Sequence, residues 1–436
     1  MTASVLAPSD LAAAVRDARA AYAAANPQSA ARHADATAVM PGGNTRTVLF
    51  YAPFPLAMTR AEGCRMWDAD GHEYVDFLGE FTAGIYGHSH PVIRAAVDGA
   101  LDRGISFGAS NMAEARFARA VCDRFALARV RFTNSGTEAN VLALSIARAF
   151  TRRPKVLAFT GGYHGAVVGF VNGRSAINVP FDVVLGTYND LEGTRALLAE
   201  HGAELAAVLV EPMQGSGGCI PGDPAFLQML RDETTRTGAL LVFDEVMTSR
   251  LAPGGLQAAL GIRPDLTTLG KYVGGGMSFG AFGGRADVMD LFDPRRPDAL
   301  PHAGTFNNNV LTMHAGLAGL TQVYTPAAAD ALNARGEALR ARLNDACARA
   351  GAPMQFTGRG SMLALHTCRG PIRSAADVAR GDAALKELVF FDLLARGIWL
   401  ARRGMMTLSL PIGDAECDAL VSAVEGFLDE RRALLA

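Results

Sequence analysis

Residues 266–276 read Leu-Thr-Thr-Leu-Gly-Lys-Tyr-Val-Gly-Gly-Gly, so that Lys271 stands between a short apolar run and three glycines. Lysine is scarce in this chain: Lys155, Lys271 and Lys386 are the three lysines among 41 Lys and Arg residues. An imine with an aldehyde requires a primary amine that can lose its proton, which a guanidinium group does not do. The stretch therefore predicts a strand followed by a lysine that performs covalent chemistry. A surface lysine at a strand end is the alternative.

The length and composition limit the classes of protein to which this chain can belong. At 436 residues, half of them hydrophobic, the chain is long enough for two or three packed regions. A formal net charge of −2 argues against nucleic acid or an anionic membrane surface as the main partner. The first ten residues lack the features of a signal peptide, and no apolar run approaches the ~20 residues that span a bilayer. The six cysteines are scattered without a CxxC pair, so we expect a reducing compartment, the cytoplasm.

Strand and helix patterns alternate through the middle of the chain. The predicted strands are residues 130–133, 155–160, 206–210, 239–243 and 266–269, and the predicted helices include residues 138–150 and 225–236. Such alternation predicts an α/β fold with a mainly parallel sheet that helices cover on both faces.

The two ends of the chain have a different texture. Residues 66–77 predict a hairpin with Asp-Gly in its turn. After about residue 320, Ala/Arg/Leu-rich helices surround two strand-like runs, 361–366 and 397–410. We expect a large domain at 76–320 and a smaller α+β domain, to which residues 1–75 and 321–436 both contribute.

Glycine-rich and polar segments follow the predicted strands, where ligands bind in open α/β sheets. Ser135, Gly136 and Thr137 stand at a strand-to-helix junction, which favours an anion cradle; an ordinary capped helix is the alternative. Residues 161–165 read Gly-Gly-Tyr-His-Gly, so Tyr163 can lie flat on a ligand ring or pack in a loop.

Asp244 directly follows the most apolar predicted strand. A carboxylate there is costly without a cationic partner, which a protonated pyridine nitrogen or a nearby arginine can provide. The loop at 304–309, Gly-Thr-Phe-Asn-Asn-Asn, offers the Thr305 hydroxyl as a further phosphate contact. Amine, carboxylate, flat aromatic ring and phosphate cradle together indicate a site for pyridoxal 5′-phosphate.

These motifs resemble those of the class-III (subgroup II) aminotransferases of fold type I, from about residue 35 to the C-terminus. The matching motifs are Gly-Thr-Glu-Ala at 136–139, Gly-Tyr-His-Gly at 162–165, Asp-Glu-Val-Met at 244–247, and Thr-Leu-Gly-Lys with three glycines at 268–276. Glutamate-1-semialdehyde 2,1-aminomutase is the nearest large branch. Residues 41–46, 244–251, 277–280 and 305–309 resemble the bacterial β-phenylalanine aminotransferases more closely.

The resemblance implies a role for each residue around the cofactor ring. Lys271 would carry the cofactor, Asp244 would pair with the ring nitrogen, and Tyr163 and Val246 would enclose the ring. Many members have Gln where Met247 stands, so the contact of that Gln with the ring's phenolic oxygen is not carried over.

The resemblance also implies how the phosphate is held and how the chain assembles. Ser135, Gly136 and Thr137 would hold the phosphate, joined by Thr305 from the neighbouring subunit of a homodimer.

Two arginines separate a transaminase from an aminomutase in this comparison. Similarity places Arg46 on the carboxylate of a β-amino acid and Arg403 on that of an α-keto acid, and a planar guanidinium fork suits both. Arg402 is the neighbour most easily confused with Arg403. A surface position is the alternative for each arginine.

The resemblance implies a transaminase that moves the amino group of an aromatic β-amino acid to 2-oxoglutarate or pyruvate. A 3-oxo acid would result, with ping-pong kinetics through an imine of Lys271. The alternatives are an aminomutase-like isomerase, an ω-amine transaminase, and a non-catalytic cofactor-binding module. A metal centre is not expected, because His88 and His90 lack a third ligand at zinc spacing.

Overall fold

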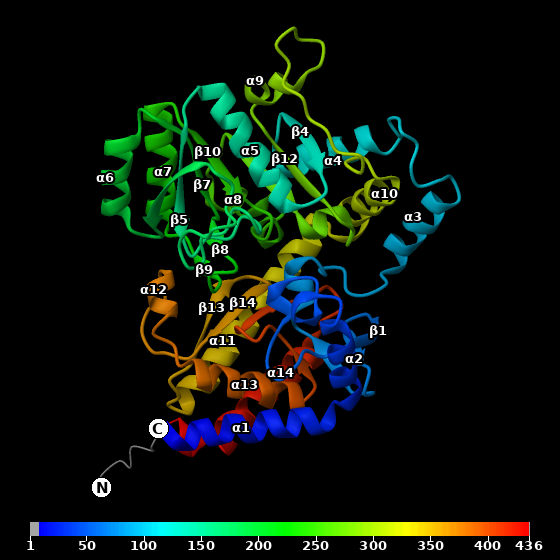
Figure 1. Cartoon of the computed structure of the whole chain (residues 1–436), viewed down its shortest axis with the longest axis vertical. Coiled ribbons are helices and arrows are strands. Elements are labelled where there is room, and N and C mark those ends of the chain that lie inside the picture. The colour runs from blue at the N-terminus through cyan, green and yellow to red at the C-terminus, as the bar shows by residue number, and fades with distance from the viewer. Residues whose placement is uncertain (1–7, 436) are drawn as a thin grey trace.

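The computed structural model describes residues 8–435, so most of the amino-terminal stretch that was considered for a signal peptide lies outside the described residues. The molecule has an upper part built on one large sheet and a lower part in which the two ends of the chain meet (Figure 1). The first helix, α1 (Pro8–Ala25), runs along the base beside the C-terminal helices.

The large sheet has seven strands, of which one runs antiparallel to its neighbours. In spatial order they are β4 (Arg129–Thr133), β12 (Gly280–Gly284), β11 (Leu266–Gly270), β10 (Leu240–Asp244), β7 (Leu205–Val210), β5 (Lys155–Thr160) and β6 (Asp182–Thr187). The five predicted strands are all present, and the prediction of a mainly parallel sheet is confirmed. The sequence analysis did not identify β6 or the antiparallel strand β12.

Helices cover both faces of this sheet and create two apolar cores. α5 (Gly136–Thr151) covers one face, and α6 (Leu191–His201) and α7 (Pro224–Thr237) cover the other. Val156 of β5 belongs to the α5 core and Leu157 to the α7 core. Neighbouring residues of the strand thus point to opposite faces, as the pleat requires. The other helices around the sheet are α3 (Pro91–Leu101), α4 (Glu114–Phe125), α8 (Gly255–Leu260), α9 (Ala286–Met289) and α10 (Val310–Ala318).

The lower part contains two small sheets. One has β1 (Met58–Glu62), β2 (Arg65–Asp68), β3 (Glu73–Asp76) and β15 (Ile398–Trp399); the other has β13 (Gln355–Arg359), β14 (Met362–His366) and β16 (Met405–Thr407). β15 pairs with β3, so the amino-terminal and carboxy-terminal segments share a sheet. The predicted hairpin is confirmed as β2 and β3, whereas the domain boundaries at residues 75 and 320 stay predictions.

The remaining helices surround these sheets. They are α2 (Pro27–Thr37), α11 (Pro326–Arg349), α12 (Ala375–Val378), α13 (Ala383–Ala395) and α14 (Asp414–Glu430). A short pair, β8 (Met213–Gln214) and β9 (Ile220–Pro221), lies between the two parts (Figure 1).

The predicted strand-like run at 397–410 is two short strands in two different sheets. Between them the chain reverses at Gly404, whose φ is +93° and whose N–H donates to the Ala401 carbonyl at 2.7 Å. This turn carries Arg402 and Arg403.

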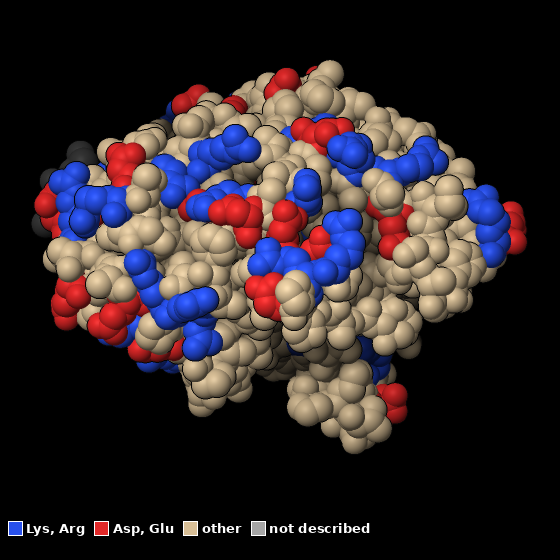
Figure 2. Space-filling view, turned by 90° about the horizontal axis from the view of Figure 1, so that it is seen from above, with Lys and Arg blue, Asp and Glu red and all other residues tan. Residues whose placement is uncertain are grey.

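Charged side chains of both signs are intermixed on the face seen from above in Figure 2. Uncharged surface separates them, and neither sign dominates that face, in keeping with the formal net charge of −2. No helix within residues 8–435 is long and apolar enough to cross a membrane.

Arg250 connects the large sheet with the lower part. Its side chain is completely buried, and it donates to Ser361 Oγ at 3.0 Å, to the Thr82 carbonyl at 3.3 Å and to the Leu408 carbonyl. Burial lowers the pKa of this guanidinium. Three segments that are distant in sequence thus depend on one donor group.

Replacing Arg250 with Ala is expected to destabilise the fold by about 2–4 kcal/mol, because two buried carbonyls and a hydroxyl lose their donor and a cavity opens. Urea unfolding followed by circular dichroism measures the change. The matched control is Arg295→Ala, which removes an exposed ion pair with Asp293 and should leave the unfolding midpoint nearly unchanged. Equal unfolding midpoints for the two variants would contradict the connecting role of Arg250.

Candidate active site

The carboxyl ends of the parallel strands meet at one edge of the large sheet, and the predicted site residues gather there. Ser135 and Tyr163 follow β4 and β5, Asp244 is the last residue of β10, and Lys271 follows β11. The register places Thr268 of β11 opposite Asp244. The sheet therefore brings the predicted amine, carboxylate, aromatic ring and helix start to the same edge.

Lys271 begins a tight turn at the end of β11. Its φ of +52° lies in the left-handed region, which residues with a side chain seldom adopt. Removal from water lowers the pKa of Lys271 to about 8; the Glu80 carboxylate opposes this shift, while the charges of Arg46 and Arg403 add to it. A large fraction of the amine is therefore neutral near pH 8, as a nucleophile requires.

Asp244 is buried, and hydrogen bonds hold its carboxylate in one orientation. Oδ2 accepts from Asn140 Nδ2 and from His164 Nδ1, both at 2.8 Å, and Oδ1 accepts from the Val246 N–H at 3.0 Å. Among the described residues, no arginine forms an ion pair with Asp244, so the alternative of a salt bridge to an arginine is wrong. The carboxylate is thus oriented without an arginine or lysine counter-ion.

The sequence analysis did not assign Asn140 or His164 to this contact. Asn140 lies on the sheet-facing side of α5 and is 1% exposed. Its Oδ1 accepts from Thr268 Oγ1 at 2.8 Å, which orients its amide N–H groups toward Asp244 and the His164 carbonyl. A polar residue on the apolar face of an amphipathic helix is the sequence signal that points to such a contact.

The start of α5 has the properties of an anion site. Ser135 is the N-cap, and its hydroxyl accepts from the Glu138 N–H at 3.2 Å. Glu138 in turn accepts from the Asn134 N–H at 3.0 Å. The N–H groups of Gly136 and Thr137 in the first turn have no acceptor within the helix, and the helix dipole adds positive potential.

Close backbone approach shapes the space beside this helix start. A Cβ atom on Gly165, whose φ is +118°, would lie 2.2 Å from Thr137 Oγ1. A Cβ on Gly136 would lie 3.0 Å from both methyl groups of Val246, and one on Gly270 would lie 3.2 Å from one of them. Val246 is therefore packed between the helix start and the end of β11, directly before Lys271.

Tyr163 lies in the loop after β5 with 44% of its surface exposed. Its backbone N–H donates to Glu211 Oε1 at 2.9 Å, and the Gly215 N–H donates to Oε2 at 2.9 Å. Burial raises the pKa of Glu211. The loop is thus fixed by its backbone while the tyrosine ring stays accessible. Enclosure of a cofactor ring by Tyr163 and Val246 stays a prediction.

Arg46 and Arg403 approach one aromatic ring from opposite ends of the chain. Their Cζ atoms lie 5.5 Å and 5.2 Å from the centroid of the Phe81 ring. Arg46 forms an ion pair with Glu80, whereas the polar contacts of Arg403 are 3.4 Å to Ser216 Oγ and 3.5 Å to Met405 Sδ, and burial lowers its pKa. The structure brings both predicted carboxylate-binding residues to one ring, that of Phe81, which the sequence analysis did not identify.

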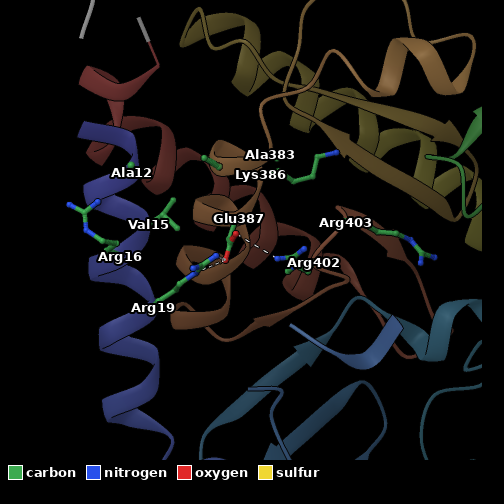
Figure 3. A pocket seen from close by; sticks show the side chains of 10 residues that line it. Ala12, Val15, Arg16, Arg19, Ala383, Lys386, Glu387, Arg402 and Arg403 are labelled. Atoms are coloured by element: carbon green, nitrogen blue, oxygen red, sulfur yellow. Dashed lines mark hydrogen bonds and ion pairs between the residues drawn. The ribbon is translucent and has the colours of Figure 1, made fainter. Parts of the chain in front are cut away.

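Arg402 and Arg403 point in different directions (Figure 3). Arg402 faces a surface cavity between α1 and α13, where its Nη1 lies 3.6 Å from Glu387 Oε2. Glu387 also pairs with Arg19 at 2.6 Å. The guanidinium of Arg403 points away from this cavity, so Arg403 is the arginine of the pair that belongs to the site geometry.

Thr305 is exposed in the loop that precedes α10. The loop is fixed to its own chain, since Asn307 Oδ1 accepts from Asn134 Nδ2 at 3.0 Å and Asn308 Nδ2 donates to Glu114 Oε1 at 2.9 Å. The contact of Thr305 with the phosphate in the neighbouring subunit stays a prediction.

The two histidines that suggested a metal site have other partners. His88 Nε2 lies 2.9 Å from Asp76 Oδ2, and His90 Nδ1 accepts from the Val92 N–H at 3.3 Å. Within residues 8–435, no group of three or more His, Cys, Asp or Glu side chains is placed to hold a metal ion.

The residues present fit pyridoxal 5′-phosphate. Asp244 offers an oriented carboxylate to a protonated ring nitrogen, the start of α5 offers N–H groups to a phosphate, and Lys271 offers an amine with a lowered pKa to the aldehyde. These three groups lie at the same edge of the sheet.

Comparison with known proteins agrees with this chemistry. Residues 50–428 match the model of the family described as aminotransferase class-III. The chain is 57% identical over 423 residues to a β-phenylalanine transaminase of Variovorax paradoxus, with 97% of each chain covered. It is 41% identical to a glutamate-1-semialdehyde 2,1-aminomutase of Sorangium cellulosum, with 86% of this chain and 89% of the relative covered. A crystal structure of a β-phenylalanine aminotransferase from Variovorax paradoxus superposes with a TM-score of 0.96 at 56% identity, covering 98% of this chain and 99% of that one.

Trace acetylation of the cofactor-free protein at increasing pH should show Lys271 reacting with a midpoint near pH 8. Only the neutral amine reacts, so the rate rises as pH passes the pKa and then levels off. Lys155 is the internal control, because its ion pair with Glu204 raises its pKa. Mass spectrometry measures both sites in one sample. A midpoint for Lys271 at or above the ordinary value of 10.5 would contradict the lowered pKa.

Gly165→Ala should weaken the binding of pyridoxal 5′-phosphate by about tenfold or more, because the new methyl group would push Thr137 out of the cradle. Titration of the cofactor-free protein, followed by tryptophan fluorescence, measures the affinity. Gly173→Ala is the matched control, since Gly173 also has a positive φ but a Cβ there would meet no atom within 4 Å. Equal affinities for the two variants would argue against a cradle at Thr137.

Proposed function

The chain belongs to the class-III aminotransferase family, and we propose that it transfers the amino group of an aromatic β-amino acid to an α-keto acid. The donor is of the β-phenylalanine type, the acceptor is 2-oxoglutarate or pyruvate, and the product of the donor is a 3-oxo acid. The observation that carries this proposal is the pair Arg46 and Arg403, which face one ring, that of Phe81, and whose charges both act on Lys271. Two carboxylate-binding groups beside one amine are what a donor acid and an acceptor acid require.

Class-III aminotransferases use pyridoxal 5′-phosphate. When bound, this cofactor supplies the electron sink that stabilises negative charge on the carbon next to the amino nitrogen. Asp244 would hold the ring nitrogen, with Asn140 and His164 keeping its carboxylate oriented before the reaction begins. Ser135, and the first-turn N–H groups that follow it, would hold the phosphate.

Lys271 provides the proton transfer in this proposal. Its neutral Nζ would take the proton from the amino-bearing carbon of the donor. The resulting ammonium group would later donate that proton to the aldehyde carbon of the cofactor. The pKa of about 8 suits both directions, because the amine is neither fully protonated nor a very weak acid near neutral pH. Tyr163 and Val246 would enclose the ring while this transfer takes place.

The two arginines divide the recognition of the substrates. Arg46 binds the carboxylate of the β-amino acid, and Arg403 binds a carboxylate of the keto acid. The surroundings of Arg403 support this assignment, because burial largely withdraws the guanidinium from water and no carboxylate among the described residues forms an ion pair with it. Buried guanidinium groups with open donor positions are suited to planar carboxylates.

We further propose a homodimer in which Thr305 of the partner subunit completes the phosphate site. Several large apolar side chains are exposed in the single chain, and burying such groups drives stable association. They include Val39, Phe50, Met112, Ile177 and Phe306, the last of which is next to Thr305.

The six cysteines are free thiols, which supports placing this enzyme in the cytoplasm.

A second candidate is an isomerase of the aminomutase type, which the 41% identity to such an enzyme favours. An isomerase moves an amino group within one substrate and needs no keto acid. A transaminase forms more than one equivalent of 3-oxo acid only when a keto acid is present, so dependence of continued turnover on the acceptor separates the two reactions.

The purified holoenzyme should turn over β-phenylalanine repeatedly only when 2-oxoglutarate or pyruvate is added, and Arg46→Ala should raise the donor KM about 100-fold with a smaller effect on kcat. The loss of a charge-assisted, forked contact of about 2–3 kcal/mol accounts for this factor. Liquid chromatography of the amino products measures both.

Arg402→Ala is the matched control and should leave the donor KM within about twofold, because Arg402 faces the cavity with Glu387. Arg46→Ala should not change the KM for the donor 1-phenylethylamine, because this amine lacks a carboxylate. Continued turnover without any keto acid would favour the isomerase. An equal rise in KM for β-phenylalanine and 1-phenylethylamine in Arg46→Ala would contradict the role of Arg46 in carboxylate binding.

A further inference from the structure

Residues 79–82 adopt an unusual backbone conformation beside the site. The φ angles of Gly79, Glu80, Phe81 and Thr82 are +52°, +46°, +53° and +83°, although three of these residues carry side chains. Positive φ angles are unfavourable for residues with a side chain, so the conformation persists only where the surroundings impose it. Conformations of this kind are concentrated at functional sites, and this segment carries the side chains of Glu80 and Phe81.

The surroundings hold the segment at both ends. Asp76 Oδ1 accepts from the N–H groups of Leu78 and Gly79, both at 2.9 Å. Thr407 Oγ1 donates to the Leu78 carbonyl at 2.9 Å, and Arg250 donates to the carbonyl that ends the segment. The positions of the two side chains between these anchors are thereby fixed.

The conformation turns neighbouring side chains in different directions. Phe81 is 8% exposed and its ring contacts both Arg46 and Arg403, whereas the Glu80 carboxylate pairs with the guanidinium of Arg46. The side chains of Arg46 and Glu80 are 46% and 57% exposed. An ion pair so accessible to water contributes little to stability, so an incoming carboxylate can replace it.

The two arginines are consequently not equivalent. Arg46 already has a carboxylate partner from its own chain, whereas among the described residues no carboxylate forms an ion pair with Arg403. Glu80 also contributes, through space, to the electrostatic environment of Lys271. A ligand carboxylate therefore meets competition at Arg46 and none at Arg403.

We propose that Glu80 is a specificity-determining residue that occupies Arg46 until the carboxylate of a β-amino acid takes its place. This inference rests on the proposed function, since it assumes that Arg46 receives the donor carboxylate. Donor binding is then an exchange of one carboxylate for another, and the ion pair lowers the affinity of every ligand that binds through Arg46. An amine without a carboxylate leaves the pair intact and is bound without this competition.

The test measures binding of 3-phenylpropionate, which has the carboxylate and ring of the donor but no amino group, to the holoenzyme by titration calorimetry. Glu80→Gln should tighten this binding about two- to fivefold, the range expected when an exposed competing ion pair is removed. In the Arg46→Ala background the same substitution should change the affinity by less than about 1.5-fold. Glu73→Gln is the matched control, because Glu73 forms a similarly exposed pair with Arg65 and should have no effect.

The outcomes are distinct. Unchanged or weaker binding by Glu80→Gln would overturn the proposal, since it would mean that Glu80 only orients Arg46. Tighter binding that persists in the Arg46→Ala background would also overturn it, since a general change in charge rather than exchange at Arg46 would then be responsible. Because no turnover is needed, a failure of the transaminase assay leaves this measurement readable. With β-phenylalanine as donor, exchange predicts a lower KM for Glu80→Gln, whereas the KM for 1-phenylethylamine should not change.

Discussion

The buried carboxylate of Asp244 is the constraint on which the arrangement of the site depends. A charge at the end of the most apolar strand costs several kcal/mol unless hydrogen bonds replace the lost water. Asn140 of α5 and His164 of the loop after β5 supply those bonds. The same two elements carry the anion site and Tyr163. Asn140 follows Ser135 by about 7.5 Å along the helix axis, so the bond to Asp244 also sets the distance from the carboxylate to the helix start.

Much of the large sheet could be predicted because its strands are short apolar runs between turn-forming residues. β12 could not be predicted, because its sequence, Gly-Ala-Phe-Gly-Gly, lacks the branched side chains that indicate a strand. The structure gives the reason. A Cβ on Gly280 would lie 2.1 Å from the Ser135 carbonyl oxygen, and one on Gly283 would lie 2.3 Å from that of Arg129. Close contact with β4 and the start of α5 thus removes the side chains from which the strand would have been recognised.

Some residues of the candidate site could likewise be predicted from the sequence, and others could not. Residues in continuous motifs, such as Ser135, Asp244 and Lys271, could be selected because the chemistry follows from a strand end or a helix start. Phe81 and Glu80 could not, since nothing in Gly-Glu-Phe-Thr indicates four positive φ angles in succession. The choice between Arg402 and Arg403 was open for a related reason. It depends on a chain reversal at Gly404 that separates two strands of different sheets, whereas the sequence reads as one continuous strand-like run.

The two parts of the molecule contribute different functions to the site. The large sheet supplies the amine and the carboxylate, whereas the segments that surround the small sheets supply Arg46, Phe81 and Arg403. Arg250 fixes one part to the other through the Thr82 and Leu408 carbonyls, so the arginines are held at a defined position relative to Lys271. The residues proposed to recognise carboxylates can therefore change without disturbing the strands that bear the amine. This separation offers a physical reason why relatives named for two different reactions, a transaminase and an aminomutase, align along most of one chain.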